Sequence, residues 1–270
     1  MTDDDLIYYV EQTLTYPIRN YADGLEIRDW GNCQTKMDPS FASPDRNLLS
    51  MIRSEAASVD AMMEEVKRYY HGHGKDQFCV MLGPNTKPSN LAEYLVGHGA
   101  TLKDRHFGMV FPVDQELEGK VDSRVEVHEI DLKGTTDDIT DMIDRAWGMP
   151  PGTCKKGVDK LRKYDEGSVY APRIFIAFHD GKPAAFSAME LYADLPVIRI
   201  AGGATDPDYR GKGLYKAMVQ ARLEAARKHG KSHLVVQAIT DTSAPILKRM
   251  GFREICVIDK YLMELVPMPS

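Results

Sequence analysis

The residues with the clearest capacity for chemistry lie in one short turn, residues 206–216. The turn joins an apolar run, which predicts a strand, to a run of helical periodicity that begins near Leu214. It contains two glycines and three basic residues: Gly211, Gly213, Arg210, Lys212 and Lys216. A strand–turn–helix junction collects unpaired backbone N–H groups and the positive end of the helix dipole at one point. Because glycine has no Cβ, an anion can approach that backbone closely. The pattern therefore predicts a phosphate-binding turn.

The spacing of these glycines excludes two common phosphate-binding motifs. A P-loop requires four residues between its first glycine and a Gly-Lys-Ser/Thr sequence, and a dinucleotide-binding fingerprint requires a third glycine. Neither arrangement surrounds Gly211 and Gly213. The remaining alternative to a ligand site is a solvated basic turn that precedes a surface helix.

The turn resembles the coenzyme A loop of the GNAT superfamily of N-acetyltransferases, whose signature is Arg/Gln-x-x-Gly-x-Gly/Ala. Arg210, Gly213 and Tyr215 fall on the three signature positions. Only Tyr215 departs from the pattern, because the family usually has a small residue there. The resemblance implies that acetyl-CoA binds through the turn and through the end of the strand before it. The implied cofactor-binding residues are Gly203, Ala204, Thr205, Arg210, Gly211, Lys212, Gly213, Leu214, Tyr215 and Lys216.

Two adjacent glycines, Gly202 and Gly203, lie within the strand that leads into this turn. Adjacent glycines weaken a strand unless they serve a bulge or a close backbone approach. The family usually places a bulge at this point, and the resemblance implies that the pantetheine arm of the cofactor pairs with the backbone beside it. The alternative is a bend of the sheet that binds nothing.

Residues 242–252 resemble a second family motif, which ends in an aliphatic residue, a glycine and a phenylalanine. Many family members carry a tyrosine four residues before that glycine, and it protonates the departing thiolate as a general acid. This chain has Leu247 there, and a leucine cannot donate a proton. Glu190, Tyr192 and Tyr215 are the predicted catalytic residues, with Asp241 as a further substitute. Each of these side chains could instead be a rim residue or a satisfied polar group.

The composition is that of an ordinary globular chain of 270 residues, 43% apolar and 27% charged, which is long enough for two domains. The net charge of −6 argues against a nucleic-acid-binding surface over the whole molecule. The cysteines are scattered, the first residues are acidic, and no apolar run approaches the roughly 18 residues of a membrane span. We therefore expect free thiols, a cytoplasmic location and no membrane partner. His71 and His73 lack a supporting ligand set, so we expect no metal site.

The elements that must position the turn follow an α+β order from residue 125 onward. The predicted strands are 125–130, 174–178, 184–191, 197–204, 233–239 and 256–265, and the predicted helices are 136–146, 156–163, 214–228 and 243–250. Asp180 and Gly181 favour a hairpin between the second and third of these strands. The resemblance implies a GNAT fold, in which helices flank a mixed central sheet.

The first half of the chain repeats part of this plan. Ala61-Met62 recurs 156 positions later as Ala217-Met218, and His73-Gly74-Lys75 recurs at the same interval. The elements predicted there are a helix at 59–70, a strand at 77–82, a helix at 89–96 and a strand at 107–113. We predict a degenerate GNAT-like domain at residues 1–118 and a catalytic GNAT domain at residues 124–270.

The repeat also allows the phosphate-binding turn to be compared with its counterpart in the first half. The same interval carries residues 210–213 back to Ser54-Glu55-Ala56-Ala57, a segment with no glycine and no basic residue. Glu55 adds a negative charge that repels phosphate at a helix start. We therefore expect no cofactor site in the first domain.

The resemblance implies an acetyl-CoA-dependent N-acetyltransferase that moves an acetyl group directly to a primary amine of a small molecule or a protein. Leu247 and Tyr215 leave a second class open, a non-catalytic acyl-CoA-binding or sensing module. A third possibility, an aminoacyl-tRNA end at the turn, is disfavoured by the acidic charge balance, and we expect no nucleic-acid partner. The sequence does not determine the acceptor, nor whether the protein is a monomer or a homodimer. The resemblance places the acceptor pocket at the helices predicted near residues 137–147 and 156–163.

Overall fold

The computed structural model describes residues 1–16, 25–39, 43–118, 123–131, 134–162 and 173–265. The chain forms two compact units. The first comprises Met1–Met109, Gln237–Pro245 and Glu254–Ser270, and the second comprises Val110–Val236 and Ile246–Arg253. Each unit therefore combines segments that are far apart in the sequence.

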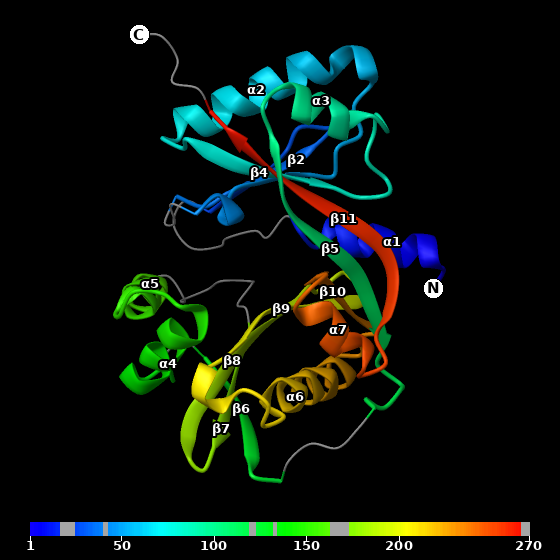
Figure 1. Ribbon diagram of the computed structural model, residues 1–270. Coiled ribbons are helices and arrows are strands. Elements are labelled where there is room, and N and C mark those ends of the chain that lie inside the picture. Colours follow the sequence, from blue (N-terminus) through cyan, green and yellow to red (C-terminus); the bar gives the residue numbers. More distant parts are fainter. Residues whose placement is uncertain (17–24, 40–42, 119–122, 132–133, 163–172, 266–270) are drawn as a thin grey trace. The chain divides into compact units, whose positions relative to one another are not determined.

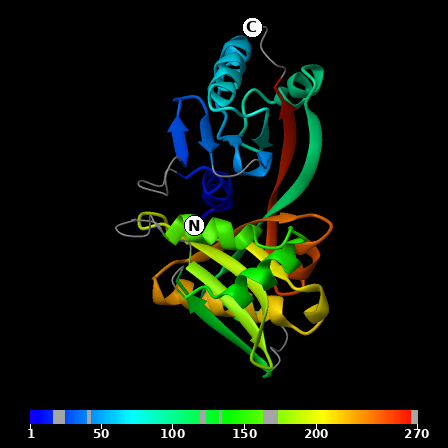
Figure 2. The ribbon, with the colours of Figure 1, turned by 90° about the vertical axis from the view of Figure 1, so that its left-hand side faces the viewer.

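The first unit is built on a mixed sheet. Its elements are α1 (Asp3–Gln12), β1 (Glu26–Asp29), β2 (Gln34–Met37), η1 (Pro44–Arg46), β3 (Leu48–Ser50), η2 (Ala56–Ser58), α2 (Val59–Gly72), β4 (Gln77–Leu82), α3 (Leu91–Gly97) and β5 (Thr101–Pro112), with β11 (Arg253–Glu264) from the end of the chain. The strand order is β1-β2-β3-β4-β11-β5. β3 and β4 run parallel, whereas β2 is antiparallel to both of its neighbours. Figure 2 shows β1 and β2 side by side next to α2.

The sequence predicts part of this unit well. The expected helix at 59–70, strand at 77–82 and helix at 89–96 are confirmed as α2, β4 and α3. The strand expected at 107–113 is longer, since β5 begins at Thr101. The sequence analysis missed β1, β2 and β3. These strands have only three or four residues, and polar residues such as Gln34 and Lys36 interrupt any apolar run.

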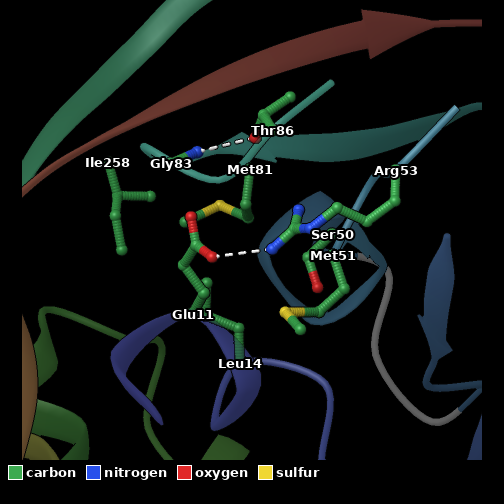
Figure 3. Close-up of a pocket in the computed structure, with 9 residues that line it drawn as sticks. All are labelled: Glu11, Leu14, Ser50, Met51, Arg53, Met81, Gly83, Thr86 and Ile258. Atoms are coloured by element: carbon green, nitrogen blue, oxygen red, sulfur yellow. Dashed lines mark hydrogen bonds and ion pairs between the residues drawn. The ribbon is translucent and has the colours of Figure 1, made fainter. Parts of the chain in front are cut away.

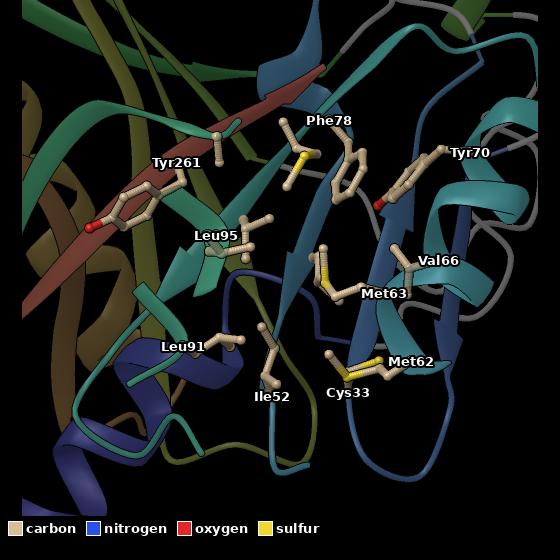
Figure 4. Packing of buried hydrophobic residues seen from close by; sticks show 14 of the residues in the cluster. Cys33, Ile52, Met62, Met63, Val66, Tyr70, Phe78, Leu91, Leu95 and Tyr261 are labelled. Atoms are coloured by element: carbon tan, nitrogen blue, oxygen red, sulfur yellow. The ribbon is translucent and has the colours of Figure 1, made fainter. Parts of the chain in front are cut away.

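The core of the first unit lies between α2 and the sheet. The face of α2 that the helical spacing predicts is buried: Val59, Met62, Met63, Val66, Tyr69 and Tyr70. Figure 4 shows four of them, Met62, Met63, Val66 and Tyr70, gathered with Phe78 and Leu95. Tyr70 stacks on Phe78 with ring centroids 4.6 Å apart. Its hydroxyl lies 2.7 Å from the carbonyl oxygen of Leu48 and 3.1 Å from that of Lys36. Burial of each large apolar side chain here contributes roughly 1.5–3 kcal/mol to the free energy of folding.

The second unit follows the predicted order of elements. They are β6 (Val125–Ile130), α4 (Asp137–Trp147), α5 (Thr153–Arg162), β7 (Arg173–His179), β8 (Lys182–Leu191), β9 (Val197–Thr205), η3 (Pro207–Tyr209), α6 (Leu214–Lys228), the first four residues of β10 (His233–Ile239) and the last three of α7 (Ser243–Lys248). The strand order is β10-β9-β8-β7-β6, with β9 and β10 parallel and the other neighbours antiparallel. The helix predicted at 156–163 is α5, which begins earlier, at Thr153, and Lys163 lies outside the described residues. Asp180 and Gly181 have φ of 51° and 74°, as the predicted hairpin turn requires.

Helices cover both faces of the sheet in the second unit (Figure 1). Met142 of α4 packs in one apolar cluster with Ile176, whereas Met218 of α6 packs in another with Ala177. Because successive strand residues point to opposite faces, α4 and α6 lie on opposite sides of β7. The predicted fold class, a mixed sheet flanked by helices, is confirmed.

The two units do not coincide with the two predicted domains. Residues 259–264 of β11 pair antiparallel with residues 77–82 of β4, and this pairing assigns the end of the chain to the first unit. Without this partner, one edge of β4 would carry unpaired N–H and C=O groups. The division of the sequence into domains at 1–118 and 124–270 stays a prediction.

None of the helices in the described residues has the length and hydropathy of a membrane span. The same residues gather no group of three or more His, Cys, Asp or Glu side chains that could hold a metal ion. All four cysteines are free, as predicted: Cys33, Cys79, Cys154 and Cys256. Burial raises the pKa of the Cys33 thiol to about 12 and that of the Cys79 thiol to about 11. Both thiols are therefore protonated and weakly reactive at neutral pH.

Candidate functional site

β9 carries a bulge at its two adjacent glycines, as the sequence predicts. The register with β8 shifts between Phe186 and Ala188, so Gly202 and Gly203 together oppose the single residue Ser187. Gly202 has a φ of 59°, a conformation that residues with a side chain rarely adopt. The glycines therefore serve a defined change of strand direction next to the turn.

Beyond the bulge, the end of β9 lies outside its ladder with β10. The parallel ladder with β10 joins residues 233–235 to residues 197–199, which is the first third of β9. Gly203 is exposed, and Ala204 and Thr205 are half-buried. An extended chain can pair with backbone N–H and C=O groups at such an edge, as in strand addition. The use of Gly203, Ala204 and Thr205 by a cofactor stays a prediction.

Asp206 anchors the base of the turn and is only 2% exposed. Its backbone N–H donates to the carbonyl oxygen of Ala184 at 3.0 Å, and its carboxylate accepts from the N–H of Asp208 at 3.2 Å. Nε of Arg145, on α4, donates to the other carboxylate oxygen at 2.9 Å. Asp206 thus joins the turn to β8 through its backbone and to α4 through its carboxylate. The sequence analysis assigned no role to Asp206 or Arg145. The Asp206-Pro207 pair at the start of the turn was the local pattern that could have pointed to Asp206.

The tip of the turn is open. Gly211 and Gly213 both have a φ of 79°, and residues 210–213 are exposed. A Cβ added to Gly211 would meet no atom within 4 Å. Gly213 is the N-cap of α6 and supplies no side-chain cap, so the first N–H groups of α6 depend on solvent or a ligand for an acceptor. The positive end of the helix dipole lies at the same place.

The three basic residues of the turn, Arg210, Lys212 and Lys216, differ in whether their charged groups lie at its tip. Arg210 is exposed, and its Nε donates to the carbonyl oxygen of Thr205 at 3.4 Å. Nζ of Lys212 lies 4.6 Å from the ring centroid of Tyr209. Lys216, in contrast, donates its ammonium group to the carbonyl oxygen of Glu118. Arg210 and Lys212 are therefore the charges that stay beside the open tip.

Tyr215 lies under the bulge. A Cβ built on Gly203 would be 2.8 Å from the Tyr215 ring, so the ring fills the space that a side chain at 203 would need. Burial raises the pKa of Tyr215, while the guanidinium of Arg222, which faces its hydroxyl, opposes that shift. A hydroxyl that faces a cation inside the protein is poorly placed to reach a leaving group at the turn. The backbone N–H of Tyr215 remains part of the open first turn of α6.

The structure joins two of the predicted catalytic residues to each other. The hydroxyl of Tyr192 donates a hydrogen bond to one carboxylate oxygen of Glu190. Arg199 donates a hydrogen bond to the other carboxylate oxygen at 2.9 Å. Arg199 precedes Gly203 by four residues, which corresponds to roughly 13 Å along a strand. Glu190 and Tyr192 therefore form one hydrogen-bonded pair, and it lies well before the bulge along β9.

The second motif has a structural role at the end of α7. Leu247 is fully buried and offers no acid, as predicted. Gly251 follows the helix with a φ of 97°, and its N–H donates to the carbonyl oxygen of Lys248 at 3.1 Å. Phe252 packs on Phe111 with ring centroids 5.1 Å apart. The Gly-Phe pair thus ends the helix and fixes it to β5.

The first unit contains a small pocket beside the ends of its own parallel strands, β3 and β4 (Figure 3). The carboxylate of Glu11, 5% exposed, lies in this pocket and forms an ion pair with Arg53 at 2.9 Å. Glu11 also accepts hydrogen bonds from the backbone and the side-chain amide of Asn85, both at 3.0 Å. A Cβ on Gly83 would lie 2.2 Å from a carboxylate oxygen of Glu11. A bonded carboxylate therefore occupies the space beyond these strand ends.

The turn after β3 also differs from the turn after β9 in its backbone pairing. The N–H of Arg53 donates to the carbonyl oxygen of Asn32 at 2.6 Å, and the N–H of Ser54 donates to that of Lys87 at 3.2 Å. Glu55 is the N-cap of η2. These amides already have acceptors, and the carboxylate at the cap adds a negative charge.

Structural comparison finds the same fold over nearly the whole chain in several proteins. A GCN5-related N-acetyltransferase from Kribbella flavida has a TM-score of 0.68 at 15% identity and covers 95% of this chain and 94% of its own. A tandem GNAT protein from the clavulanic acid biosynthesis pathway has a TM-score of 0.64 at 12% identity, with coverage of 96% and 89%. A GCN5-related N-acetyltransferase from Sphaerobacter thermophilus has a TM-score of 0.59 at 14% identity, with coverage of 100% and 96%. These likenesses confirm the GNAT fold, and one of them is to a tandem GNAT protein.

Comparison by sequence gives a narrower result. No curated protein matches the chain. The model of the acetyltransferase (GNAT) family matches residues 137–252, which run from the start of α4 to the Gly-Phe pair after α7 and include the bulge and the open turn. Residues 137–252, a little under half of the chain, therefore match the GNAT acetyltransferase family, and this match supports an acyltransferase activity.

Proposed function

We propose that the chain is an acetyl-CoA-dependent N-acetyltransferase that moves an acetyl group directly to a primary amine of a small molecule or a protein. The observation that carries this proposal is the open turn between β9 and α6 in a domain of this family. Its glycines have positive φ, its tip is exposed, and the first N–H groups of α6 have no side-chain cap. A diphosphate needs such a set of donors.

The residues present fit acetyl-CoA. The amides of residues 211–216 would hold the diphosphate, with Arg210 and Lys212 beside it. The backbone of Gly203, Ala204 and Thr205 would pair with the pantetheine arm, since this end of β9 lies beyond the β10 ladder. When bound, the cofactor supplies an acetyl group activated as a thioester. Gly211 offers open space at its Cα, so nothing obstructs the close approach that this binding requires.

Acetyl transfer forms a bond between the amine nitrogen and the thioester carbonyl carbon and breaks the C–S bond. The amine loses one proton, and the thiolate gains one from the amine or from water. The chain contributes by holding the amine against the carbonyl, and such positioning is worth roughly 7–11 kcal/mol of the barrier. Backbone N–H groups at the bulge would stabilise negative charge on the carbonyl oxygen. Glu190, with Tyr192, is our candidate to receive the amine proton, and it would do so through a chain of waters because the pair lies roughly 13 Å from Gly203 along the strand.

We place the acceptor at α4 and α5. Trp147, at the end of α4, is half-exposed, and Arg145 on the same helix is bonded to Asp206 at the base of the turn. A helix tied to the cofactor turn in this way can orient an amine relative to the thioester. A screen of amines for coenzyme A release would identify the acceptor.

The first unit, in this proposal, has no cofactor. The amides of Arg53 and Ser54 are paired with other backbone groups, and the carboxylate of Glu11 fills the space beside β3 and β4. A diphosphate would have to displace these bonds and lie next to Glu55. Both requirements oppose binding of an anion.

A non-catalytic acyl-CoA-binding or sensing module is the second candidate function. Leu247 supports it, because the usual acid is missing from α7 and the chain offers no hydroxyl at that position. The two functions differ in turnover and not in cofactor affinity.

Calorimetric titration of the purified protein with acetyl-CoA tests both functions together. We expect one site per chain, with a Kd in the micromolar range that is ordinary for an enzyme substrate. Absence of binding up to millimolar acetyl-CoA would overturn both. A thiol-release assay against a broad set of amines then separates them, because release of coenzyme A with any amine removes the non-catalytic alternative.

A further inference from the structure

Arg222, on α6, is the largest fully buried side chain in the described residues, at 1% exposed. Its Nε donates to the carbonyl oxygen of Met218 at 3.0 Å, and its Nη1 donates to that of Ala188 at 3.2 Å. Within the described part of the chain, its Nη2 has no hydrogen-bond partner and no carboxylate balances its charge. A buried cation without a counter-charge is strongly unfavourable, so its presence calls for a functional explanation.

Tyr215 connects this guanidinium to the bulge of β9. It lies seven residues before Arg222 on α6, and so on the same face of the helix. Its hydroxyl faces the Arg222 guanidinium, and its ring fills the space beside Gly203, where a Cβ would lie 2.8 Å away. The tyrosine that departs from the family pattern and the glycine at the bulge are therefore parts of one arrangement.

Ser187 completes the polar surroundings of the bulge. It opposes the two glycines from β8, is fully buried, and its Oγ has no hydrogen-bond partner among the described residues. Phe186 packs on the α4 side of the sheet, so Ser187 faces α6. The carbonyl that accepts from Arg222 belongs to the next residue, Ala188. Ser187, Tyr215 and Arg222 therefore lie together on the α6 side of the bulge.

We propose that Arg222 is a positioning residue for acyl transfer, which with Tyr215 fixes the bulge of β9 and places a positive charge behind its backbone N–H groups. This inference rests on the proposed function, because it concerns the same bulge. Negative charge develops on the carbonyl oxygen during transfer, and a cation fixed in a low-dielectric interior stabilises that charge without reorganisation. Arg222 acts through the bulge and does not touch the reacting atoms.

The energetics separate this role from a purely structural one. Replacing buried ionic groups with apolar side chains of similar volume is often neutral or stabilising, and Arg222 has no carboxylate partner that the replacement would leave unpaired. A positioning role therefore predicts that Arg222→Met slows the reaction while stability is kept or raised. A structural role predicts the opposite pattern, in which the rate falls only because the protein loosens.

The experiment measures kcat, the KM for acetyl-CoA, thermal stability and the amide NMR resonance of Gly203 in the parent and in Arg222→Met. We expect kcat to fall roughly 10- to 100-fold, with KM within about threefold of the parent. The midpoint of thermal unfolding should not fall, and the Gly203 resonance should move. Lys228→Met removes a positive charge from an exposed position of the same helix, and it should match the parent in all four measurements.

The outcomes separate this inference from the proposed function. If the parent is active and Arg222→Met keeps kcat within about threefold, the inference is overturned and the proposed function stands. A fall in kcat that comes with a lower unfolding temperature and weaker acetyl-CoA binding also overturns the inference, in favour of a structural role. A parent that releases no coenzyme A with any amine overturns both.

A second pair of variants tests the contact between Gly203 and Tyr215. Gly203→Ala forces the Tyr215 ring away and should lower kcat to a similar degree as Arg222→Met. In a Tyr215→Ala background the added methyl group has room, so the same change should alter kcat by less than about twofold. Equal effects of Gly203→Ala in both backgrounds would show that the two residues are not coupled, and would overturn the proposed arrangement.

Discussion

Two strand–turn–helix junctions of this chain have the same plan and the same length. In the first unit, residues 51–58 join β3 to α2, and in the second, residues 206–213 join β9 to α6. Each turn has eight residues, contains a short 3-10 helix, and follows a strand that is paired in parallel with the next strand of its sheet. In the first turn, backbone amides donate to carbonyl oxygens of neighbouring segments, at Asn32 and Lys87, whereas the second turn presents its amides at an exposed tip.

The difference shows that topology alone does not make an anion site. In the first turn, the amides of Arg53 and Ser54 are paired and the carboxylate of Glu11 occupies the adjoining space. In the second, glycines hold the left-handed conformation and no side chain caps α6. What separates the two junctions is whether backbone donors are left unpaired and whether a carboxylate stands nearby.

Gly213→Asp breaks the comparison most severely, because it makes the open turn resemble the closed one. A side chain at a φ of 79° is strained, and its carboxylate would stand where phosphate binds. We expect acetyl-CoA affinity to fall by roughly 100-fold or more, a loss of about 2.7 kcal/mol, as measured by calorimetry. Affinity equal to that of the parent would show that the turn is not the cofactor site.

Gly83→Ala tests the filled pocket of the first unit. The new Cβ would meet the Glu11 carboxylate, which Arg53 and Asn85 hold in place. We expect a loss of about 1–3 kcal/mol in the free energy of unfolding, measured with urea. In a Glu11→Ala background the obstacle is gone, and Gly83→Ala should cost far less. The same cost in both backgrounds would mean that Glu11 does not fill the pocket.

In the first unit, Asp45 precedes β3 and interacts with the ammonium groups of Lys103 and Lys260, and its contribution to stability can be measured by acid titration. Burial alone would raise the pKa of Asp45, but Lys103 and Lys260 lower it from 3.8 to about 2. A lowered pKa contributes stability that is complete above 3.8 and is lost as the pH falls through about 2. Since Asp45 is partly exposed, we expect Asp45→Asn to lose only about 1 kcal/mol at neutral pH.

Urea unfolding of Asp45→Asn and the parent at a series of pH values measures this contribution. The difference between the two proteins should be largest near neutral pH and should disappear only below about pH 2. A difference that does not change over this range would mean that the charge of Asp45 is not its source.

Glu55→Lys is the mildest change. It reverses the charge at the N-cap of η2 and leaves the paired amides of the first turn in place. We expect no change in acetyl-CoA affinity and no second binding event in calorimetry. A second site in this variant would show that charge alone keeps the first junction from binding the cofactor.

The sequence analysis succeeded where local patterns carry the information. Periodicity gave α2 and its buried face, and the Gly202-Gly203 pair gave the bulge. It missed β1–β3, whose short polar segments acquire strand structure only through their neighbours. The sequence analysis named Glu190, Tyr192 and Tyr215 as candidates for acid and base but could not show their surroundings. The hydrogen bond between Glu190 and Tyr192 and the contact of Tyr215 with Gly203 exist only in the packed sheet.

By itself, the sequence determined the order of elements from residue 125 onward, the fold class and the glycine turn, because each depends on residues that are close together in the chain. The tertiary structure alone decided three further features. It gave the end of the chain to the sheet of the first unit, it placed Glu11 against Gly83, and it buried Arg222 behind the bulge. Each of these joins residues that are distant in sequence or on different elements. Their contact energies exist only once the sheets and helices have packed, and no local pattern encodes them.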